Sequence, residues 1–360
     1  SLYGKIRSVF MSKSKGVLLL NLGSPEALTV PAVREYLNEF LMDGRVIDLP
    51  FIARRLLVSL LLINRPKVKV EEYRSIWTDD GSPLIATSRK VQAKLQEHFD
   101  FPVELAMNYA KPDIAGALKR LQDAGVKELF IMPLYPHYAM SSYETVVAKT
   151  MKQIKELGHP FQTSLLEPFY ADADYIDALF TLAQPDLDAG FDHLLFTFHG
   201  IPERHLRKSD PSHEHCMVTP DCCATCHPAH ASCYRHQCLR TAKAFVEKAE
   251  IPDDKYSVAF QSRLGRDPWL EPYTDQTLEK YGRKGFGKLL IISPSFVTDC
   301  LETMEEIAIA GKETYQAAGG KEFKLVPCLN EHPAWIRFLE VRVRNWVDAG
   351  VESQIGRLAS

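Results

Sequence analysis

The fold is decided by the stretch Val17-Leu18-Leu19-Leu20-Asn21-Leu22, an apolar run that leads directly into Gly23-Ser24-Pro25. A short apolar run that ends in glycine and proline is typical of a strand buried on both faces. Residues 31–42 then carry apolar side chains at helical spacing, with Pro31 in the first turn, where its missing N–H costs nothing. This order of strand, turn and helix predicts a parallel sheet covered by crossover helices.

The same alternation recurs along the chain. Further strands are predicted at residues 103–107, 129–134, 194–198, 257–260, 289–292 and 323–326. Further helices are predicted at residues 113–124, 143–157, 240–250, 274–281, 302–318 and 335–347. We therefore predict an α/β protein with two Rossmann-like lobes, each a roughly four-stranded parallel sheet flanked by helices. A closed eight-stranded barrel is the weaker alternative.

The predicted lobes divide the chain near its middle. The N-terminal lobe is expected to span residues 16–168 and the C-terminal lobe residues 169–332, and a helix over 333–356 is expected to pack back on the first lobe. Residues 1–10 precede the first methionine and lack the apolar core of a signal sequence, so we expect a leader outside the fold.

Charge and hydropathy argue against a nucleic-acid-binding protein and against a membrane-spanning one. With 43 Lys and Arg against 46 Asp and Glu, the formal charge is −3, so no general attraction to nucleic acid is expected. The longest apolar stretch, residues 56–63, is far shorter than the roughly 20 residues of a membrane-spanning helix.

Polar side chains follow several predicted strands, at the edge where open parallel sheets bind ligands. His199 ends one strand, and Glu302 and Glu306 are spaced to share one face of a helix. A histidine facing paired carboxylates suits proton abstraction or the handling of a divalent metal. The ordinary alternative for His199 is a structural role, and for Glu302 and Glu306 it is a charged surface. No G-x-G-x-x-G or P-loop motif follows a predicted strand, which disfavours a nucleotide site.

The chain resembles the ferrochelatases, which insert ferrous iron into a porphyrin to make haem. The resemblance extends over nearly all of residues 16–345. It is carried by the motifs Leu20-Asn21-Leu22-Gly23-Ser24-Pro25, Phe40-Leu41-Met42-Asp43-Gly44-Arg45, Gly81-Ser82-Pro83-Leu84, Tyr135-Pro136-His137-Tyr138, His199-Gly200-Ile201-Pro202, Gln261-Ser262-Arg263-Leu264-Gly265, Pro268-Trp269-Leu270 and Thr298-Asp299-Cys300-Leu301-Glu302-Thr303.

The resemblance implies a set of site residues. His199 matches the family's active-site histidine and is expected to accept pyrrole protons, and with Glu302 to meet the Fe²⁺ substrate. Glu306, one turn on, is expected to extend an acidic path for metal or protons. Cys300 stands where many relatives have a second histidine, and we interpret it as a tolerated substitution. The expected porphyrin contacts are Tyr135, Tyr138, Ser262, Trp269 and Phe296.

Six of the eight cysteines lie between Cys216 and Cys238, within an apparent insert over 213–238. Clustered cysteines in a reducing compartment suggest a metal rather than disulfides. Some ferrochelatases carry a [2Fe–2S] cluster, and here the expected ligands are Cys216, Cys223, Cys226 and Cys233, with Cys222 and Cys238 as alternates. A structural Zn²⁺, with extra ligands among His213, His215, His227 and His230, and the absence of any metal remain open.

The segment 51–63 combines an apolar run with Arg54-Arg55 and is followed by further basic residues. It is either a core helix or, as in the family, a lip that touches an anionic bilayer. We therefore expect a cytoplasmic enzyme with peripheral contact at the inner face of the membrane. The expected reaction converts protoporphyrin IX and Fe²⁺ into protohaem. The alternatives are a coproporphyrin ferrochelatase, another tetrapyrrole metal chelatase, or a non-catalytic haem or Fe–S sensor.

Overall fold

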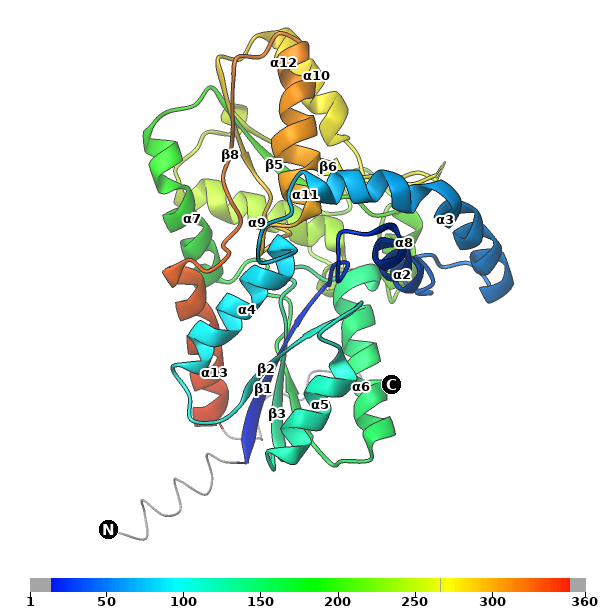
Figure 1. Ribbon diagram of the computed structural model, residues 1–360. Helices are drawn as coiled ribbons and strands as arrows, with labels where there is room; N and C mark the ends of the chain where they lie inside the picture. The colour runs from blue at the N-terminus through cyan, green and yellow to red at the C-terminus, as the bar shows by residue number, and fades with distance from the viewer. Residues whose placement is uncertain (1–13, 266, 350–360) are drawn as a thin grey trace. The chain divides into compact units, whose positions relative to one another are not determined.

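The computed structural model describes residues 14–265 and 267–349 and contains two four-stranded sheets in which all strands are parallel (Figure 1). The first sheet has the order β2-β1-β3-β4 and the second the order β6-β5-β7-β8, so the topology repeats. The strands are β1 (Lys15–Asn21), β2 (Val103–Met107), β3 (Glu128–Pro133), β4 (Gln162–Leu165), β5 (His193–His199), β6 (Tyr256–Gln261), β7 (Lys288–Ile292) and β8 (Glu322–Leu325). The predicted α/β class is confirmed, and within the described residues the strands form two open sheets rather than a closed barrel.

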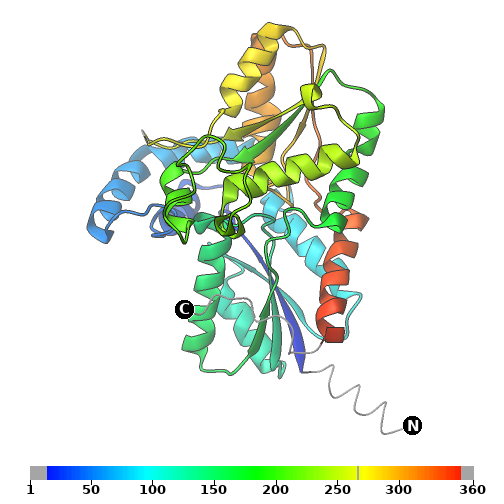
Figure 2. The ribbon, with the colours of Figure 1, turned by 180° about the vertical axis from the view of Figure 1, so that it is seen from behind.

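Helices connect these strands (Figures 1 and 2). The α-helices are α2 (Val30–Leu41), α3 (Phe51–Arg74), α4 (Pro83–Gln96), α5 (Ile114–Asp123), α6 (Thr145–Leu157), α7 (Ala173–Asp188), α8 (Glu203–Ser209), α9 (Tyr234–Lys248), α10 (Thr274–Lys284), α11 (Leu301–Met304), α12 (Lys312–Ala317) and α13 (Pro333–Ala349). The π- and 3-10 helices are η1 (Met140–Glu144), η2 (Pro228–Ala231), η3 (Asp253–Lys255) and η4 (Glu306–Gly311).

The described chain forms two compact units. The first comprises residues up to Leu134, Ser141–Glu167 and those from Trp335 onward, and the second comprises Tyr135–Met140 and Pro168–Ala334. The expected leader, and residues 350–356 of the expected C-terminal helix, lie outside the described residues.

In the first unit, the four apolar side chains of β1 at residues 17–20 are fully buried. The C-terminal helix α13 joins this core, because Trp346 stacks on Phe130 with ring centroids 5.3 Å apart and donates a hydrogen bond to Ser164. Trp346 also lies under the ammonium group of Lys15, 4.8 Å from the ring centroid. These contacts fix the last described helix to β1, β3 and β4.

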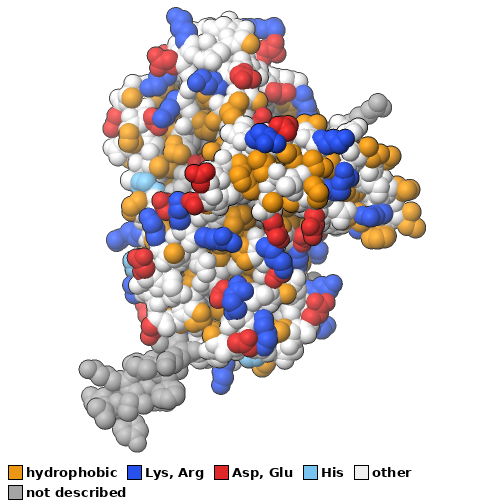
Figure 3. Space-filling view, in the orientation of Figure 1, with side chains coloured by type: hydrophobic (Ala, Val, Ile, Leu, Met, Phe, Trp, Pro, Cys, Tyr) orange, Lys and Arg blue, Asp and Glu red, His pale blue; other side chains and the backbone are white. Residues whose placement is uncertain are grey.

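The long helix α3 has two different faces. Its buried side chains recur every three or four residues, at Val58, Leu62, Pro66, Val70 and Tyr73. Pro66 has no N–H for the carbonyl of Leu62, and Arg34 of α2 donates to that carbonyl instead, so the helix continues through the proline. Figure 3 shows hydrophobic side chains gathered over α3, with Lys and Arg side chains among them.

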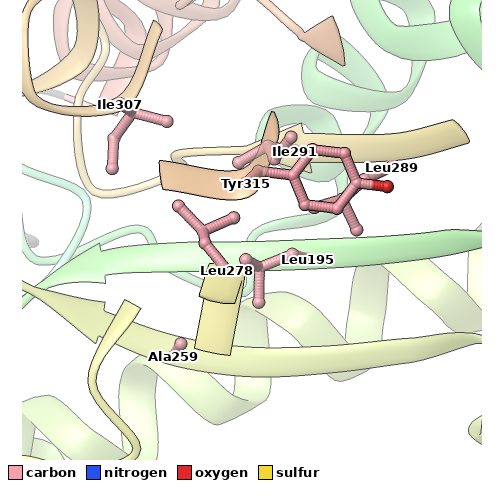
Figure 4. Close-up of a cluster of buried hydrophobic side chains, with 7 residues drawn as sticks. All are labelled: Leu195, Ala259, Leu278, Leu289, Ile291, Ile307 and Tyr315. Carbon is pink, nitrogen blue, oxygen red and sulfur yellow. The ribbon is translucent and has the colours of Figure 1, made fainter. Parts of the chain in front are cut away.

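The second unit is a three-layer sandwich. One face of its sheet packs on α10, η4 and α12 (Figure 4), through the buried side chains Leu195, Ala259, Leu278, Leu289, Ile291, Ile307 and Tyr315. The other face packs on α9 and α7, because Phe196 of β5 meets Phe245 of α9 edge-on and Phe245 meets Phe180 of α7. Figure 2 shows α9 running across this face. Because helices cover both faces of the sheet, a ligand can reach it only at the ends of the strands.

The structure differs from the sequence-based expectations in several elements. The predicted helix 302–318 is divided into α11, η4 and α12. Helix α9 begins at Tyr234 rather than at residue 240. The short edge strand β4 and the helices α4, α7 and α8 were not predicted. The segment between α8 and α9 contains turns and the short helix η2, as expected of an insert.

Candidate active site

His199 is the last residue of β5, at the end of a strand whose preceding residues are buried. Its Nδ1 lies 2.6 Å from the carbonyl oxygen of Gly200. A carbonyl can only accept a hydrogen bond, so Nδ1 carries the proton and Nε2 carries the lone pair. The local backbone thus selects the tautomer that can accept a proton or bind a metal at Nε2.

The turn after His199 requires glycine at position 200. The Gly200 N–H donates to the carbonyl of Gln261 at 2.6 Å. A Cβ at Gly200 would lie 2.9 Å from the carbonyl oxygens of both Gln261 and Ser262, and 3.4 Å from the ring of Trp269. Close approach of β5 to the chain after β6 therefore explains the His-Gly motif.

Gln261 and Ser262 connect this turn to the acidic residues. Gln261, which pairs with His199 in the β5–β6 register, donates to the carbonyl of Glu302 at 2.9 Å and lies 3.3 Å from Glu306 Oε2. The Ser262 hydroxyl lies 2.6 and 2.9 Å from the two carboxylate oxygens of Glu306. Ser262 also has a positive φ of 59°, a strained conformation that is common at functional sites.

A π-helical turn lies within the segment that carries Glu302 and Glu306. In η4 the N–H of Ala310 bonds to the carbonyl of Glu305 at 2.9 Å, five residues back. This wider turn follows directly on α11, where Glu302 lies, and Glu306 opens it. Single π-turns inside helices occur frequently at functional sites.

The Cys300 thiol is buried next to Glu302. Burial, followed by the charge of Glu302 and a hydrogen bond with its carboxylate, holds the pKa of Cys300 well above its usual range. Cys300 also caps α11 through Thr303, since its Sγ accepts from the Thr303 N–H and its N–H donates to Thr303 Oγ1. A protonated thiol that donates to Glu302 and caps a helix suits a structural role, and the interpretation of Cys300 as a tolerated substitution stays a prediction.

The predicted porphyrin contacts separate into two groups. Phe296 meets the His199 ring edge-on with centroids 6.3 Å apart, and Trp269 packs over Gly200. Together with Ser262 they lie around the ends of β5, β6 and β7. Tyr138 instead lies beside α9, since its N–H donates to Gln237. The hydroxyl of Tyr135 is buried, and burial raises its pKa.

Sequence reasoning missed two residues that hold His199. The hydroxyls of Ser295 and Tyr234 bind the backbone N–H and carbonyl of His199 at 3.3 and 2.8 Å. Ser295 lies three residues after the predicted strand 289–292, and this strand-end position was the available signal. No sequence pattern connects position 234 with position 199.

All eight cysteines are free thiols, and those of the insert partly gather. Cys233 shares hydrogen bonds with both Cys216 and Cys223, and Cys223 also contacts Cys222. Burial raises the pKa of Cys216 to about 11, and the hydrogen bond with Cys233, followed by burial, raises that of Cys223. Cys226, in contrast, is exposed.

Histidine rings border the cysteines. His215 stacks on His227 with ring centroids 3.8 Å apart, and His230 stacks on His236 at 3.7 Å. As arranged in the described part of the chain, however, no three His, Cys, Asp or Glu side chains form a group that could hold a metal ion. The thiols are the right donors for an iron–sulfur cluster. To bind one, their side chains would have to move closer together than they are in this structure.

The fold is shared with solved structures of SirB, one of which is described as a sirohydrochlorin chelatase. A solved structure described as SirB from Bacillus subtilis with Fe³⁺ matches with a TM-score of 0.53 and 11% identity, covering 92% of this chain and 95% of that chain. At that identity the match supports the fold alone, which is the two-lobe chelatase fold.

The family is identified by sequence. The ferrochelatase family model matches residues 14–346. The curated ferrochelatase of Pseudomonas entomophila is 53% identical over 90% of this chain and 96% of its own length, and that of Azotobacter vinelandii is 51% identical over 89% and 95%. The chain therefore belongs to the ferrochelatase family, a class of lyases that insert metal into a porphyrin, and the predicted resemblance is confirmed.

Proposed function

We propose that the chain inserts Fe²⁺ into protoporphyrin IX to give protohaem, with His199 as the group that accepts the pyrrole protons. The observation that carries this role is the hydrogen bond from His199 Nδ1 to Gly200, which leaves a lone pair at Nε2. Metalation releases two pyrrole N–H protons for each Fe²⁺ bound, so an acceptor at the strand end is required. Histidine is the side chain that most often serves as a general base, and it suits this task.

Glu302 and Glu306 complete the proposed machinery. Oxygen and imidazole ligands suit Fe²⁺ when it arrives as substrate. Glu302 follows the Cys300 cap, and Glu306 is fixed by Ser262 and Gln261, so the two carboxylates lie along α11 and η4. We assign Glu302 to contact with the incoming Fe²⁺ and Glu306 to the path that delivers the metal or removes protons. We assign Trp269 and Phe296 to a flat apolar surface that contacts the macrocycle beside His199. Tyr135 and Tyr138, which form the second group, are assigned to a separate contact with the porphyrin.

The porphyrin preference tests the substrate assignment. We infer protoporphyrin IX from the relatives named ferrochelatase and from the family resemblance, which assigns segment 51–63 to an apolar lip; an apolar lip favours two vinyl edges over four propionates. Purified protein is mixed anaerobically with Fe²⁺ and either protoporphyrin IX or coproporphyrin, and the Soret band is followed. We expect kcat/KM to be at least about tenfold higher for protoporphyrin IX. A preference for coproporphyrin overturns the substrate assignment, and no metalation of either porphyrin overturns the activity.

We also propose that the insert holds a [2Fe–2S] cluster through Cys216, Cys223, Cys226 and Cys233, with Cys222 and Cys238 as alternates. The hydrogen bonds that join Cys233 to Cys216 and Cys223 support three of these ligands. The exposed Cys226 would have to turn inward, whereas Cys222 already contacts Cys223. Such a cluster would supply thiolate–iron bonds that fix the insert, and no step of metalation passes through it.

Iron and sulfide analysis decides whether the cluster exists. We expect two irons and two sulfides per chain, with visible absorption that is lost in Cys233→Ser. The single variants Cys226→Ser and Cys222→Ser then distinguish the fourth ligand, because only the true ligand abolishes the cluster. Colourless protein with one zinc, or intact absorption in Cys233→Ser, contradicts the proposal.

A third proposal concerns the enzyme's location. We propose that α3 makes peripheral contact with an anionic membrane from the cytoplasmic side. Phe51, Ile52, Leu56, Leu60 and Ile63 are each more than half exposed, and Arg55 and Lys67 lie exposed on the same helix. Such an apolar face with cations is typical of helices that lie in a bilayer interface. Over residues 14–265 and 267–349, no helix is long and apolar enough to span a membrane.

Vesicle sedimentation tests this contact. We expect binding to vesicles that contain phosphatidylglycerol, and a loss of about tenfold or more in the double variant Ile52→Asp/Leu60→Asp. The matched control is Val218→Asp, which changes an equally exposed apolar residue outside α3. Equal binding by the double variant and the wild type would rule out α3 as the contact.

A further inference from the structure

The backbone of His199 is held by side chains rather than by the sheet on its β7 side. The paired register of β5 and β7 ends at Phe196 and Ile292, so it does not reach His199. There the His199 N–H donates to Ser295 Oγ at 3.3 Å, and the His199 carbonyl accepts from the Tyr234 hydroxyl at 2.8 Å. Two hydroxyl groups thus replace the missing ladder bonds.

These three residues form a closed ring of hydrogen bonds. The hydroxyl of Tyr234 also bonds with that of Ser295. Tyr234 has a single proton, which goes to the His199 carbonyl, so Ser295 must donate to the Tyr234 oxygen. Each donor is therefore used once around the ring, an arrangement in which hydrogen bonds reinforce one another. The Cys238 thiol contacts the same tyrosine hydroxyl.

The ring fixes the peptide that aims the imidazole. The carbonyl of the His199–Gly200 peptide is bound by Tyr234, and the N–H of the same peptide is bound by the Gln261 carbonyl at 2.6 Å. Because the ring Nδ1 bonds to the next carbonyl, that of Gly200, rotation of this peptide would turn Nε2 away from its present direction. A small misalignment of a proton acceptor lowers the rate strongly.

Tyr234 also joins this peptide to the cysteine insert. It is the first residue of α9, and Cys233 is the N-cap of that helix. Cys233 contacts Cys216 and Cys223, while the Tyr234 ring is 5% exposed and packs edge-on against His137 with centroids 5.8 Å apart. The tyrosine is therefore a rigid connection, since burial and packing against His137 restrict its ring.

We propose that Tyr234, supported by Ser295, is a positioning residue that aims His199 Nε2 at the porphyrin nitrogens, and that it ties this aim to the insert through Cys233. The inference rests on the proposed role of His199. It assigns no contact between Tyr234 and the substrates.

The test compares Tyr234→Phe, which removes only the hydroxyl, with the matched control Tyr315→Phe. Tyr315 is also buried in the second unit, and its hydroxyl donates to the carbonyl of Phe286 at 2.7 Å. In the metalation assay we expect kcat to fall about tenfold in Tyr234→Phe, with KM for porphyrin and Fe²⁺ within about twofold of wild type. Tyr315→Phe is expected to keep kcat within about twofold even if its Tm falls equally. Ser295→Ala should lower kcat in the same way as Tyr234→Phe.

The decisive measurement repeats Tyr234→Phe in a His199→Ala background. In His199→Ala the imidazole that Tyr234 would position is gone. Adding Tyr234→Phe should therefore alter the remaining metalation rate by less than about twofold. An equal loss in both backgrounds, or a change in KM alone, overturns the positioning role. A wild-type rate in His199→Ala alone overturns the proposed function instead, so the two failures are distinguishable.

Discussion

At the scale of single residues, backbone geometry at the end of β5 selects the tautomer of His199 on which its proposed role depends. The sequence showed that His199 ends an apolar strand and precedes glycine, and this was enough to nominate it. It could not show that Nδ1 bonds to Gly200, because a tautomer depends on a carbonyl placed by the turn. Nor could it show Ser262 bonding to Glu306, which lies 44 residues away in the chain.

Replacing Gly200 by alanine should damage both stability and activity. The new Cβ would meet two backbone carbonyls that cannot rotate away, so we expect a loss of about 1–3 kcal/mol in the free energy of unfolding. Urea denaturation followed by circular dichroism measures it. In the control Gly287→Ala the Cβ meets only the end of the Asp192 side chain, and the loss should be clearly smaller. Equal losses would contradict the close approach described here.

The Cys300 thiol should be chemically inert in the folded protein. Burial and Glu302 raise its pKa, and a protonated, inaccessible thiol reacts slowly with alkylating reagents. At pH 8 we expect alkylation of Cys300 by iodoacetamide to be at least about 100-fold slower than in urea, as judged by mass spectrometry of its peptide. Glutathione in the same tube provides the rate standard. Rapid labelling in the folded enzyme would show that Cys300 is accessible and ionised, which is the state that a metal ligand requires.

At the scale of elements, hydrophobic patterning located most of the structure. Apolar runs predicted β1, β5 and β7, because central strands are buried on both faces. Strand β4 was missed because Gln162-Thr163-Ser164-Leu165 is an edge strand with little apolar patterning. The π-turn η4 was missed because apolar spacing does not reveal a single widened turn within a helical segment. Helix α9 was shortened because Cys233 and Cys238 were interpreted as part of the insert.

The opposite end of the second sheet provides a test of stability against pH. His193 begins β5 and stacks on Phe286, and burial, followed by Lys284 and Lys255, lowers its pKa to about 4. The unfolded chain binds a proton near pH 6.5 but the folded protein does not until about pH 4, so stability is lost as pH falls through this window.

Between pH 7 and 5 we expect the free energy of unfolding to fall about 1–2 kcal/mol more in the wild type than in His193→Gln. Urea titrations of both proteins at the two pH values measure the difference, and other titrating groups cancel in the comparison. An identical pH dependence in the two proteins would show that His193 titrates normally.

At the scale of the whole molecule, the repeated strand order explains where the site lies. In an open parallel sheet of this order, ligands bind where neighbouring strands lead off in opposite directions, here between β5 and β7. His199 follows β5, and Ser295, Phe296 and Glu302 follow β7. The second unit thus places a histidine, an aromatic ring and a carboxylate after the two strands of one switch point, which is where the proposed roles of His199, Phe296 and Glu302 need them.

The most direct test of the central claim is a single-turnover metalation measured by anaerobic stopped flow, with protoporphyrin IX and Fe²⁺. Wild-type protein should form haem, and His199→Ala should lose about 10²–10⁴-fold in rate, the usual contribution of a general base. His193→Gln, at the other end of the same strand, should stay within about twofold of wild type. Haem formation by His199→Ala at the wild-type rate would contradict the account.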